Sequence, residues 1–411
     1  MLSRIKSLVP QFVRNWFHFA NAAAALIYYQ NPAKNLKIIA VTGTDGKTTT
    51  STLIYHLLKA ADLKVALIST LAAYIGDRQI DTGFHVTSPD PWALQKLIKE
   101  IHAQNFDYLV LEATSHGLDQ HRLLGIKPKL AVLTNITHEH LDYHKTHHNY
   151  LMAKAKLFLT AKNSLLNPHD SSYPRLKALL ASRTSIATYA PEDLPAPLLQ
   201  ALNTRFPEPY NRQNAAAAII ALHVLGIAPA SLSSALTSFP GVPGRMQHLP
   251  NNKGLNLIVD FAHTPNALKK ALESLRPQTK GKLIAVYGAA GLRDHTKRPM
   301  MGKVGSELAD EVILTAEDPR TESVEVIIRQ MLSGATKNIS HLHTKTDRQE
   351  AINFAVSLAK KGDTIGIFGK GHEQSMCFGT TEYPWSDVQA AEKAIKIATK
   401  AKKVANSARH L

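Results

Sequence analysis

The stretch "VTGTDGKTTT", residues 41–50, follows the apolar run "LKIIA" and precedes "STLIYHLLKAADL", which has helical periodicity. A strand, a glycine-rich turn and a helix in this order are the setting of a phosphate-binding loop. Gly43 and Gly46 would let backbone N–H groups approach phosphate oxygens, Lys47 would neutralise their charge, and the Thr48 hydroxyl would bind Mg²⁺. Valine stands where the full eight-residue pattern needs glycine, so the loop is a shortened variant. It predicts nucleotide binding, and a structural glycine turn is the alternative.

Apolar runs alternate with helical patterns along the rest of the chain. The runs are "LKIIAVTG", "KVALIST", "DYLVLEA", "LAVLTNI", "NLIVDF", "KLIAVYG", "EVILTA" and "DTIGIFG". Nearly continuous apolar runs are typical of parallel strands that are buried on both faces. The stretch "SFPGVPGR" (238–245) has the proline and glycine content of an inter-domain hinge. We therefore expect an α/β protein: a central parallel-sheet domain like that of P-loop ATPases in residues 37–240, and a smaller Rossmann-like α/β domain in residues 241–411.

Composition sets the class of protein. The 411 residues exceed one average domain, and 44% hydrophobic with 19% charged residues is ordinary for a globular protein and excludes disorder. One cysteine, Cys377, cannot form an internal disulfide, which favours the cytoplasm. The net charge of +16 would attract nucleic acid, anionic lipid or a polyanionic substrate. No basic tract is interleaved with aromatic residues, so we expect no nucleic-acid partner, and the basic tail "KAIKIATKAKKVANSARH" indicates a solvated helix.

The first 36 residues predict an amphipathic helical segment. Arg14, His18 and Asn21 interrupt its apolar stretch, which is too short and too polar to span a bilayer. Apolar side chains at roughly helical spacing lie beside basic ones: Leu2, Ile5, Leu8, Phe12 and Trp16 beside Arg4, Lys6 and Arg14. Two roles stay open, which are packing on the domain that follows and peripheral contact with an anionic membrane surface.

Two further strand ends carry candidate metal ligands. Glu112 ends the run "DYLVLE", at the carboxyl edge where open α/β sheets bind ligands, and a carboxylate there can hold Mg²⁺. A strand-end acid facing water is the alternative. The stretch 131–158 contains His138, His140 and His144, which together suggest zinc, but their spacing is not that of the helical HExxH pair. Zinc is therefore not favoured.

Ordered motifs identify a resemblance to the Mur ligase family, specifically to its MurE type, which adds the third residue of the peptidoglycan stem peptide. They run from about residue 20 to residue 390. Besides the phosphate loop they are "TSPD" (87–90), "EATSHGL" (112–118), "TNITHEHLDYH" (134–144), "YLMAKAKLF" (150–158), "NRQNA" (211–215), "GRM" (244–246), "DFAHTPNAL" (260–268), "GLRDHTKRPMMG" (291–302), "EDPR" (317–320) and "GKGHE" (369–373).

The resemblance implies an ATP-dependent amide ligation in peptidoglycan precursor synthesis. ATP would phosphorylate the carboxylate of UDP-MurNAc-L-Ala-D-Glu, and the amine of a diamino acid would attack the acyl phosphate. By similarity the catalytic residues are Lys47, Glu112, His140 and Lys154. The resemblance also implies two Mg²⁺ sites, the first held by Thr48 and Glu112 and the second by His140. Lys154 matches the lysine that the family carbamylates into a carboxylate-like metal ligand.

The remaining site residues also follow from the resemblance. The implied ATP-binding set is Gly43, Thr44, Asp45, Gly46, Lys47, Thr48, Thr49, Asn214 near the adenine, and Arg245, Arg293 and Asp294 from a closing C-terminal domain. The implied substrate-binding set is Thr87, Ser88, Ser115, Arg122, His263, Asp318, Arg320, Gly369 and Glu373. Closure would bring the amine and the acyl phosphate together out of water.

Arg320 bears on the identity of the incoming amino acid. In the family the arginine of this motif clamps the distal carboxylate of meso-diaminopimelate, and a guanidinium fork suits a carboxylate. We therefore expect diaminopimelate, with a surface-loop arginine as the alternative. The preceding pair is Glu317 and Asp318, where the family usually has Asp and Asn, so this chain carries an extra charge there.

Few residues precede the first strand, whereas MurE enzymes carry a uridine-binding domain there. We expect this domain to be lacking, so the substrate is either UDP-MurNAc-dipeptide bound by central motifs or another carboxylate, such as a lipid-linked one. Rival hypotheses are a folylpolyglutamate synthase-like ligase, a glutamine-dependent amidation partner, which usually carries four zinc-binding cysteines, and a nucleic-acid motor. A non-catalytic, membrane-recruited nucleotide-binding protein is a rival of another class. We expect a cytoplasmic monomer.

Overall fold

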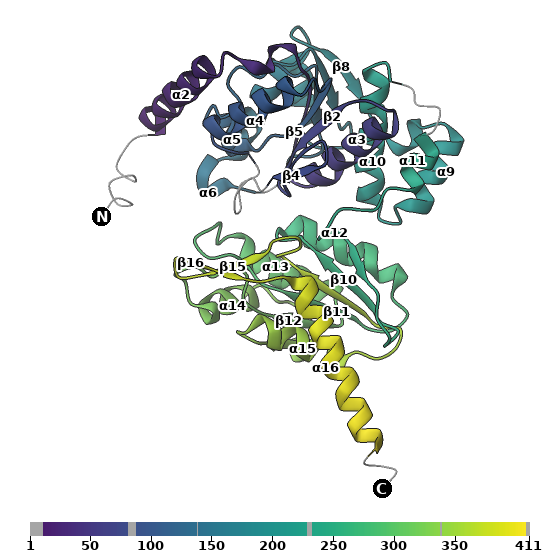
Figure 1. Cartoon of the computed structure of the whole chain (residues 1–411). Helices are drawn as coiled ribbons and strands as arrows, with labels where there is room; N and C mark the ends of the chain where they lie inside the picture. Colours follow the sequence, from purple (N-terminus) through teal and green to yellow (C-terminus); the bar gives the residue numbers. More distant parts are fainter. Residues whose placement is uncertain (1–10, 81–87, 138, 228–231, 338, 408–411) are drawn as a thin grey trace. The chain divides into compact units, whose positions relative to one another are not determined.

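The computed structural model describes residues 11–80, 88–137, 139–227, 232–337 and 339–407. The chain divides into two compact units, Met1–Pro240 and Gly241–Leu411 (Figure 1). The boundary between them lies within the stretch 238–245, whose prolines and glycines suit a connection between domains. Each unit is built around its own sheet, so each is described by itself.

The first unit contains an eight-stranded sheet in the order β4-β3-β2-β5-β1-β6-β7-β8. Strands β2, β5, β1, β6, β7 and β8 pair in parallel, and β3 and β4 add antiparallel strands at one edge. The bounds are β1 (Lys37–Thr42), β2 (Val65–Ile68), β3 (Ala73–Ile75), β4 (Arg78–Ile80), β5 (Tyr108–Glu112), β6 (Leu130–Leu133), β7 (Asn163–Leu166) and β8 (Ser185–Thr188).

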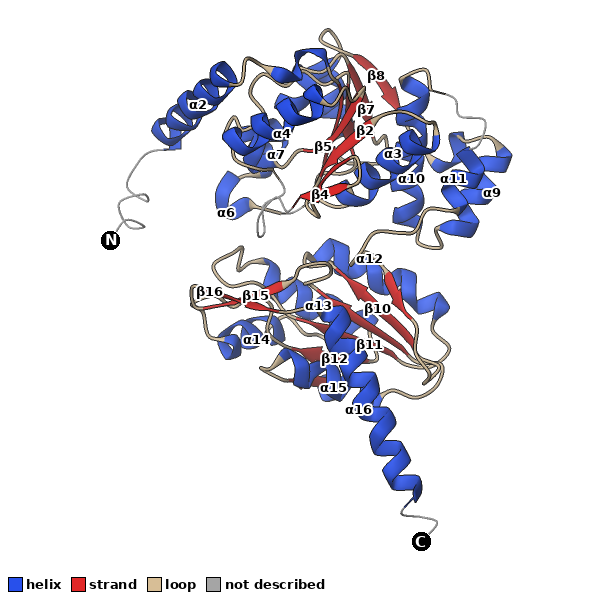
Figure 2. Cartoon of the chain, viewed as in Figure 1, coloured by secondary structure: helices blue, strands red, loops and turns tan. Residues whose placement is uncertain are grey.

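Helices cover both faces of this sheet (Figure 2). They are α3 (Lys47–Ala60), α4 (Pro91–Ala103), α5 (Ser115–Asp119), α6 (Leu141–His144), α7 (His147–Leu159), α8 (Tyr173–Leu180), α9 (Ala196–Arg205), α10 (Pro209–Val224) and α11 (Leu232–Thr237). The central strands β1, β5 and β6 are buried, except for Lys37 at the start of β1. This double-sided burial explains why their sequences are continuous apolar runs instead of alternating ones.

The second unit contains a six-stranded sheet in the order β13-β12-β11-β14-β10-β9, parallel except for β9. The bounds are β9 (Gln247–Leu249), β10 (Asn256–Asp260), β11 (Leu283–Tyr287), β12 (Glu311–Leu314), β13 (Leu342–Thr344) and β14 (Thr364–Phe368), with a separate hairpin of β15 (Ser375–Phe378) and β16 (Thr381–Pro384). The helices are α12 (Pro265–Leu275), α13 (Lys297–Leu308), α14 (Val324–Leu332), α15 (Arg348–Leu358) and α16 (Asp387–Ser407). The α/β prediction is confirmed in both units.

Helix α2 (Gln11–Tyr28) precedes the first strand, followed by a short 3₁₀ turn at Pro32–Asn35. Ala22 and Ala25 on one side of α2 are buried against the first unit, where the helix packs on α4. The predicted apolar positions Leu2, Ile5 and Leu8 lie outside the described residues. No helix in the described part of the chain is both long and apolar enough to cross a membrane.

Candidate active site

The phosphate loop lies at the point where the strand order of the first sheet reverses. β1 is flanked by β5 on one side and β6 on the other, with Val41 opposite Glu112 and Thr42 opposite Leu133. The carboxyl ends of these three strands therefore meet at one edge. Open parallel sheets bind ligands in the crevice at such a switch point.

Two close approaches explain why the loop needs its glycines. A side-chain carbon on Gly43 would lie 1.8 Å from the Thr134 hydroxyl, and one on Gly46 would lie 2.3 Å from Oδ1 of Asn214. Gly46 also has a positive φ of 83°, which other residues rarely adopt. The loop is thus held closely between the end of β6 and helix α10.

The residues between these glycines are fixed by hydrogen bonds to the segment after β6. The Thr44 amide donates to the Asn135 carbonyl at 2.8 Å, and the Asp45 amide donates to the Asn135 side chain at 2.9 Å. The Thr44 hydroxyl lies 3.0 Å from the Tyr150 hydroxyl. The amides of Thr44 and Asp45, both predicted ATP-binding residues, thus hold the loop in shape by bonding to Asn135.

The donors that remain for phosphate come from the start of α3. Gly46 is its N-cap and provides no side-chain cap for the first-turn amides, which include those of Lys47, Thr48 and Thr49. The Lys47 ammonium donates to the carbonyls of Gly43, at 3.1 Å, and Thr44, at 2.7 Å, so it curls over the loop. The first-turn amides of α3 and the Lys47 ammonium together form a positively polarised site for an anion.

Glu112 is fully buried at the end of β5 and lies next to this helix start. Three hydroxyls donate to its carboxylate: Thr48 at 3.2 Å, Ser51 at 3.0 Å and Thr70 at 2.9 Å. All three are neutral groups, and a buried carboxylate is costly unless a cation balances it. Oxygen ligands of this kind are those that Mg²⁺ prefers, so the pair of Thr48 and Glu112 fits a magnesium ion.

Lys154 reaches the same loop from helix α7. Its side chain is 1% exposed, its ammonium donates to the Gly43 carbonyl at 2.6 Å and lies 4.6 Å from the centre of the Tyr150 ring. Burial, and secondarily the nearby Lys47 charge, lower the pKa of Lys154 well below its ordinary value. A larger fraction of neutral amine is therefore present than on a surface lysine.

His140 lies within an aromatic cluster beside Lys154. It has a φ of 56° and its ring centre lies 4.6 Å from that of His116 and 6.3 Å from that of Tyr150. His144 lies 5.3 Å from Tyr150, also by ring centres. In the described residues no three or more His, Cys, Asp or Glu side chains gather in a way that would hold a metal ion, and His138 lies outside them. The zinc interpretation therefore gains no support from this cluster.

The predicted acceptor residues of the first unit gather around the start of α5. The Ser88 hydroxyl lies 3.0 Å from that of Thr114, and Arg122 donates to the Ser88 carbonyl at 2.7 Å. The buried Ser115 hydroxyl has no hydrogen-bond partner among the described residues. Thr87, the other predicted substrate residue here, lies outside the described part of the chain. The cluster therefore offers hydroxyls and a guanidinium to a polar substrate.

Asn214 lies against the phosphate loop, through its contact with Gly46. Its amide donates to Asn211 at 3.3 Å, and Asn211 donates in turn to Glu208 at 3.0 Å. This chain of side chains runs along the first turns of α10. Asn214 thus packs directly against the loop backbone at Gly46.

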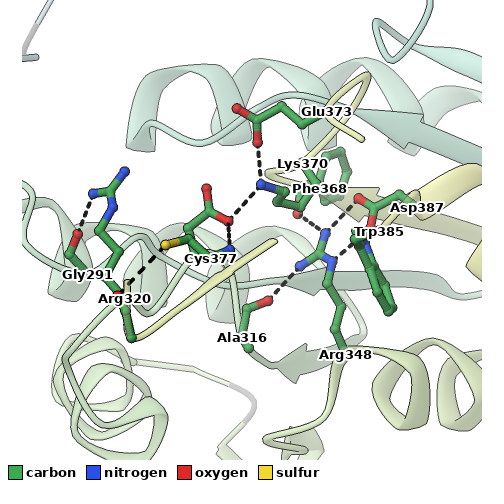
Figure 3. A network of polar contacts seen from close by, with 12 residues as sticks. Gly291, Ala316, Arg320, Arg348, Phe368, Lys370, Glu373, Cys377, Trp385 and Asp387 are labelled. Carbon is green, nitrogen blue, oxygen red and sulfur yellow. Dashed lines mark hydrogen bonds and ion pairs between the residues drawn. The ribbon is translucent and has the colours of Figure 1, made fainter. Parts of the chain in front are cut away.

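The second unit brings the "EDPR" and "GKGHE" motifs together. Lys370 is buried and donates to Asp318 at 2.8 Å and to Glu373 at 2.5 Å, as Figure 3 shows for Glu373. Arg320 donates to the Gly291 carbonyl at 2.7 Å, and its backbone pairs with the β15 strand. These are the predicted substrate residues Asp318, Arg320 and Glu373. Lys370 thus joins the two carboxylates, and the backbone of Arg320 is linked to Asp318 through Cys377.

The other predicted residues of the second unit occupy neighbouring loops. A side-chain carbon on Gly244 would lie 2.1 Å from the His372 amide, so the "GRM" turn packs directly on "GKGHE". The Arg245 guanidinium lies 4.2 Å from the centre of the Phe261 ring, and the His263 ring lies 4.5 Å from it. Arg293 is exposed, whereas Asp294 accepts hydrogen bonds from the amide and hydroxyl of Thr296.

Glu317 was given no role by sequence reasoning, although it begins the "EDPR" motif. Its side chain is 5% exposed, and its Oε2 has no hydrogen-bond partner in the described part of the chain. A side-chain carbon on Gly369 would lie 2.3 Å from that oxygen. Burial raises the pKa of Glu317 to about 7, although Lys297 and Arg348 oppose the rise. The extra acid of this motif is therefore largely protonated below neutral pH.

Glu317 should make stability pH-dependent. Its folded pKa of about 7 exceeds the ordinary 4.5, so the folded state binds the proton more tightly. This stabilisation is complete below pH 4.5 and is lost as the pH rises through 7. Glu317→Gln cannot ionise, so its stability relative to the parent should rise by about 2–3 kcal/mol between pH 5 and pH 8.

Urea unfolding of both proteins at the two pH values measures this difference. Glu392→Gln, which changes an exposed glutamate of α16, is the matched control and should show no such trend. An equal effect of Glu317→Gln at pH 5 and pH 8 would mean that Glu317 titrates normally.

The roles of several other residues of the site could not be predicted from the sequence. Ser51 and Thr70 bind Glu112, yet Thr70 follows β2, and only the strand order reveals that β2 neighbours β5. Asn135 and Tyr150 stand inside motifs that had been recognised, so their positions were marked although their roles were not. Their contacts with Thr44 and Asp45 depend on how β6 and α7 approach the loop.

Comparison with known proteins agrees with this geometry. Residues 41–201 match the Mur ligase middle domain, and residues 244–371 match the Mur ligase, glutamate ligase domain. UDP-N-acetylmuramoyl-L-alanyl-D-glutamate--2,6-diaminopimelate ligase of Clostridium botulinum is 38% identical over 389 residues, which cover 90% of this chain and 80% of that protein.

Solved structures of Mur ligases and of folylpolyglutamate synthases share this fold. A structure of UDP-N-acetylmuramoyl-L-alanyl-D-glutamate--2,6-diaminopimelate ligase superposes with a TM-score of 0.59 at 32% identity, over 89% of this chain and 80% of that one. The bifunctional folylpolyglutamate synthase/dihydrofolate synthase of Yersinia pestis reaches a TM-score of 0.67 at 20% identity, over 85% and 90% of the two chains, a likeness of fold alone. The motifs, the fold and these matches together establish that the chain belongs to the Mur ligase family.

Proposed function

We propose that this chain is an ATP-dependent amide ligase of the MurE type, which joins meso-diaminopimelate to UDP-MurNAc-L-Ala-D-Glu. The observation that carries the proposal is the convergence of three groups on one loop. Residues 43–48 include the start of α3, which has no side-chain cap. Two buried groups contact this loop: the Glu112 carboxylate at Thr48 and the Lys154 amine at Gly43. Nucleotide binding accounts for the helix start and for Glu112, whereas a buried lysine that reaches the loop from α7 indicates a further role at the reacting phosphate.

ATP would bind with its phosphates at the start of α3. The first-turn amides are directed donors, and Lys47 would exchange its two neutral carbonyl acceptors for a charged phosphate oxygen, which is a stronger acceptor. Thr48 and Glu112 would hold the first Mg²⁺. When bound there, Mg²⁺ would neutralise charge on the phosphates and so assist attack at phosphorus.

Lys154 would serve as a carbamate. A carbamate forms when a neutral amine attacks CO₂ and releases one proton to water, and burial, which lowers the pKa of Lys154, favours the neutral amine. The carbamate nitrogen retains one hydrogen, so it can still donate to the Gly43 carbonyl. Its negative charge would replace the repulsion between Lys154 and Lys47 by an attraction. His140, which packs on the same Tyr150 ring, would complete a second Mg²⁺ site with it.

The acceptor carboxylate would bind near the start of α5. Ser115 has a buried hydroxyl that lacks a partner among the described residues, and Arg122 supplies a positive charge next to Ser88. A carboxylate oxygen of the dipeptide would attack the γ-phosphorus, and ADP would leave. The amine nitrogen would then attack the acyl carbon, and inorganic phosphate would leave as the amide forms and the amine loses a proton.

The incoming amino acid would bind to the network of the second unit. Lys370 is already paired with two carboxylates, Asp318 and Glu373. The three side chains together have a net negative charge, which suits an ammonium group. Arg320 would exchange its neutral acceptor, the Gly291 carbonyl, for a carboxylate. These three side chains and Arg320 would then bind the ammonium and the carboxylate at the end of the amino acid that does not react. meso-Diaminopimelate carries both groups there, whereas lysine carries only the ammonium, so the pair supports diaminopimelate.

Arg320→Ala tests this assignment. A lost charge-assisted hydrogen bond to a carboxylate costs about 1.5–3 kcal/mol, so the KM for meso-diaminopimelate should rise about 10–100-fold, whereas the KM for ATP should change little. Arg329→Ala, which removes an exposed arginine of α14, is the matched control. If Arg320→Ala leaves the KM for diaminopimelate unchanged, this arginine does not bind the amino acid.

A further inference from the structure

Helix α2 carries an exposed apolar stripe. Trp16, Phe17, Ile27 and Tyr28 are 71%, 67%, 77% and 67% exposed, and Val13 begins the same row at 41%. With the exposed Ala20 and Ala24 they repeat at intervals of three and four residues, so they lie along one side of the helix. Large contiguous apolar surfaces are rare on proteins that have no partner for them.

Specific contacts hold the opposite side of α2 against the first unit. Asn15 donates to Asp119 at 3.4 Å, and Asn21 accepts a hydrogen bond from Trp92 at 3.0 Å. The Leu26 side chain lies so close to Gly125 that a side-chain carbon there would be 2.4 Å away. These contacts hold one side of the helix against the rest of the first unit, and the exposed apolar residues lie on the other side. Figure 1 shows where α2 lies in the first unit.

The charge around the stripe indicates which kind of partner it fits. The first 44 residues contain five basic residues, Arg4, Lys6, Arg14, Lys34 and Lys37, and the first acidic residue of the chain is Asp45. Arg14 is exposed next to Trp16 on the same helix. A basic, acid-free segment with exposed tryptophan, phenylalanine and tyrosine is the composition of helices that lie in the interface of an anionic bilayer.

We propose that α2 is a peripheral membrane anchor, whose stripe from Val13 to Tyr28 inserts among the headgroups of anionic phospholipids. Trp92, which is 37% exposed on α4, lies 5.6 Å from Tyr28 by ring centres and widens the inserting surface. The rigid contacts with α4 and α5 mean that the whole first unit is held at the lipid surface. This inference does not depend on the ligase activity, because none of its residues belongs to the active site.

Vesicle co-sedimentation of the full chain tests the proposal. We expect binding to vesicles of phosphatidylcholine with about one third phosphatidylglycerol, little binding to pure phosphatidylcholine, and weakening as salt rises. Trp16→Ser/Ile27→Ser should reduce the partition coefficient at least 10-fold. Tyr383→Ser/Ile397→Ser is the matched control, because it removes one exposed aromatic and one exposed aliphatic side chain elsewhere and should bind as the parent does.

Three results would overturn the proposal: failure of the parent chain to bind anionic vesicles, equal binding of the parent and of Trp16→Ser/Ile27→Ser, or equal loss in both double variants. Light scattering of the parent and the Trp16→Ser/Ile27→Ser variant adds a second readout. If the parent self-associates, the variant does not, and neither binds vesicles, the stripe is a contact between copies of the chain instead of a lipid-binding surface. Circular dichroism establishes that the substituted chains are folded.

Discussion

Replacing Lys154 by alanine should lower the rate of ligation about 100-fold to 1,000-fold, the loss typical of removing one charged group that acts on the reacting phosphate. The reason is its position: a buried amine that donates to Gly43 at 2.6 Å within the phosphate loop. Lys156→Ala is the matched control. It lies two residues away on α7, pairs with Asp119 at 2.8 Å and is 41% exposed, so its removal should change the rate less than 2-fold.

A second readout separates the carbamate from a plain lysine. If Lys154 acts as a carbamate, the parent should lose activity when CO₂ and bicarbonate are removed and regain it when they are restored. Acetate or formate should partly restore Lys154→Ala, because a small carboxylate fits the space left by the side chain. Full activity of the parent without bicarbonate, together with no restoration by carboxylates, would contradict the carbamate and leave the ammonium as the active form.

Asp387→Ala should destabilise the second unit by about 3–5 kcal/mol, because it leaves a buried guanidinium without its partner charge. Arg348 and Asp387 have fully buried side chains and are joined by two hydrogen bonds, at 2.8 and 2.7 Å. Arg348 also donates to the carbonyls of Ala316 and Phe368, as Figure 3 shows. These carbonyls directly precede the "EDPR" motif and the "GKGHE" motif, so the same pair fixes both loops.

Urea unfolding measures this loss, and Glu273→Ala is the control. Glu273 lies 3.7 Å from Lys269 on α12, and both side chains are at least half exposed, so this pair should contribute about 0.5 kcal/mol or less. We also expect Asp387→Ala to weaken binding of the amino acid, since the loops that carry Asp318 and Lys370 lose their anchor. A change in stability below about 1 kcal/mol would show that Arg348 finds water or another partner.

Most strands at the sheet centres could be predicted from sequence, whereas the edge strands and the short inner strands β3 and β7 could not. All eight apolar runs that were expected to be strands are strands, because burial on both faces requires continuous apolar side chains. The edge strands β4 and β8 are short and partly exposed, so they carry no such pattern. β15 and β16 form a separate hairpin, whose polar positions resemble those of a loop.

The residues of the site could be predicted from sequence, but the contacts between them could not. Motifs identified Lys47, Glu112 and Lys154, but not that Lys154 bonds to Gly43 or that Thr70 supports Glu112, since both contacts depend on the strand order. The N-terminal helix was expected either to pack on the protein or to contact a membrane. The structure shows one side packed and the other exposed, which a helical pattern without a partner cannot specify.

The most direct test of the central claim is the mass of the product formed from ATP, Mg²⁺ and UDP-MurNAc-L-Ala-D-Glu with meso-diaminopimelate, with lysine, or with no amine. We predict phosphate release and a mass gain of one diaminopimelate residue with diaminopimelate only. Product with lysine alone would contradict the role proposed for Arg320. No product with either amine, from a chain that binds ATP, would contradict the MurE-type activity and direct the search to lipid-linked or other carboxylates.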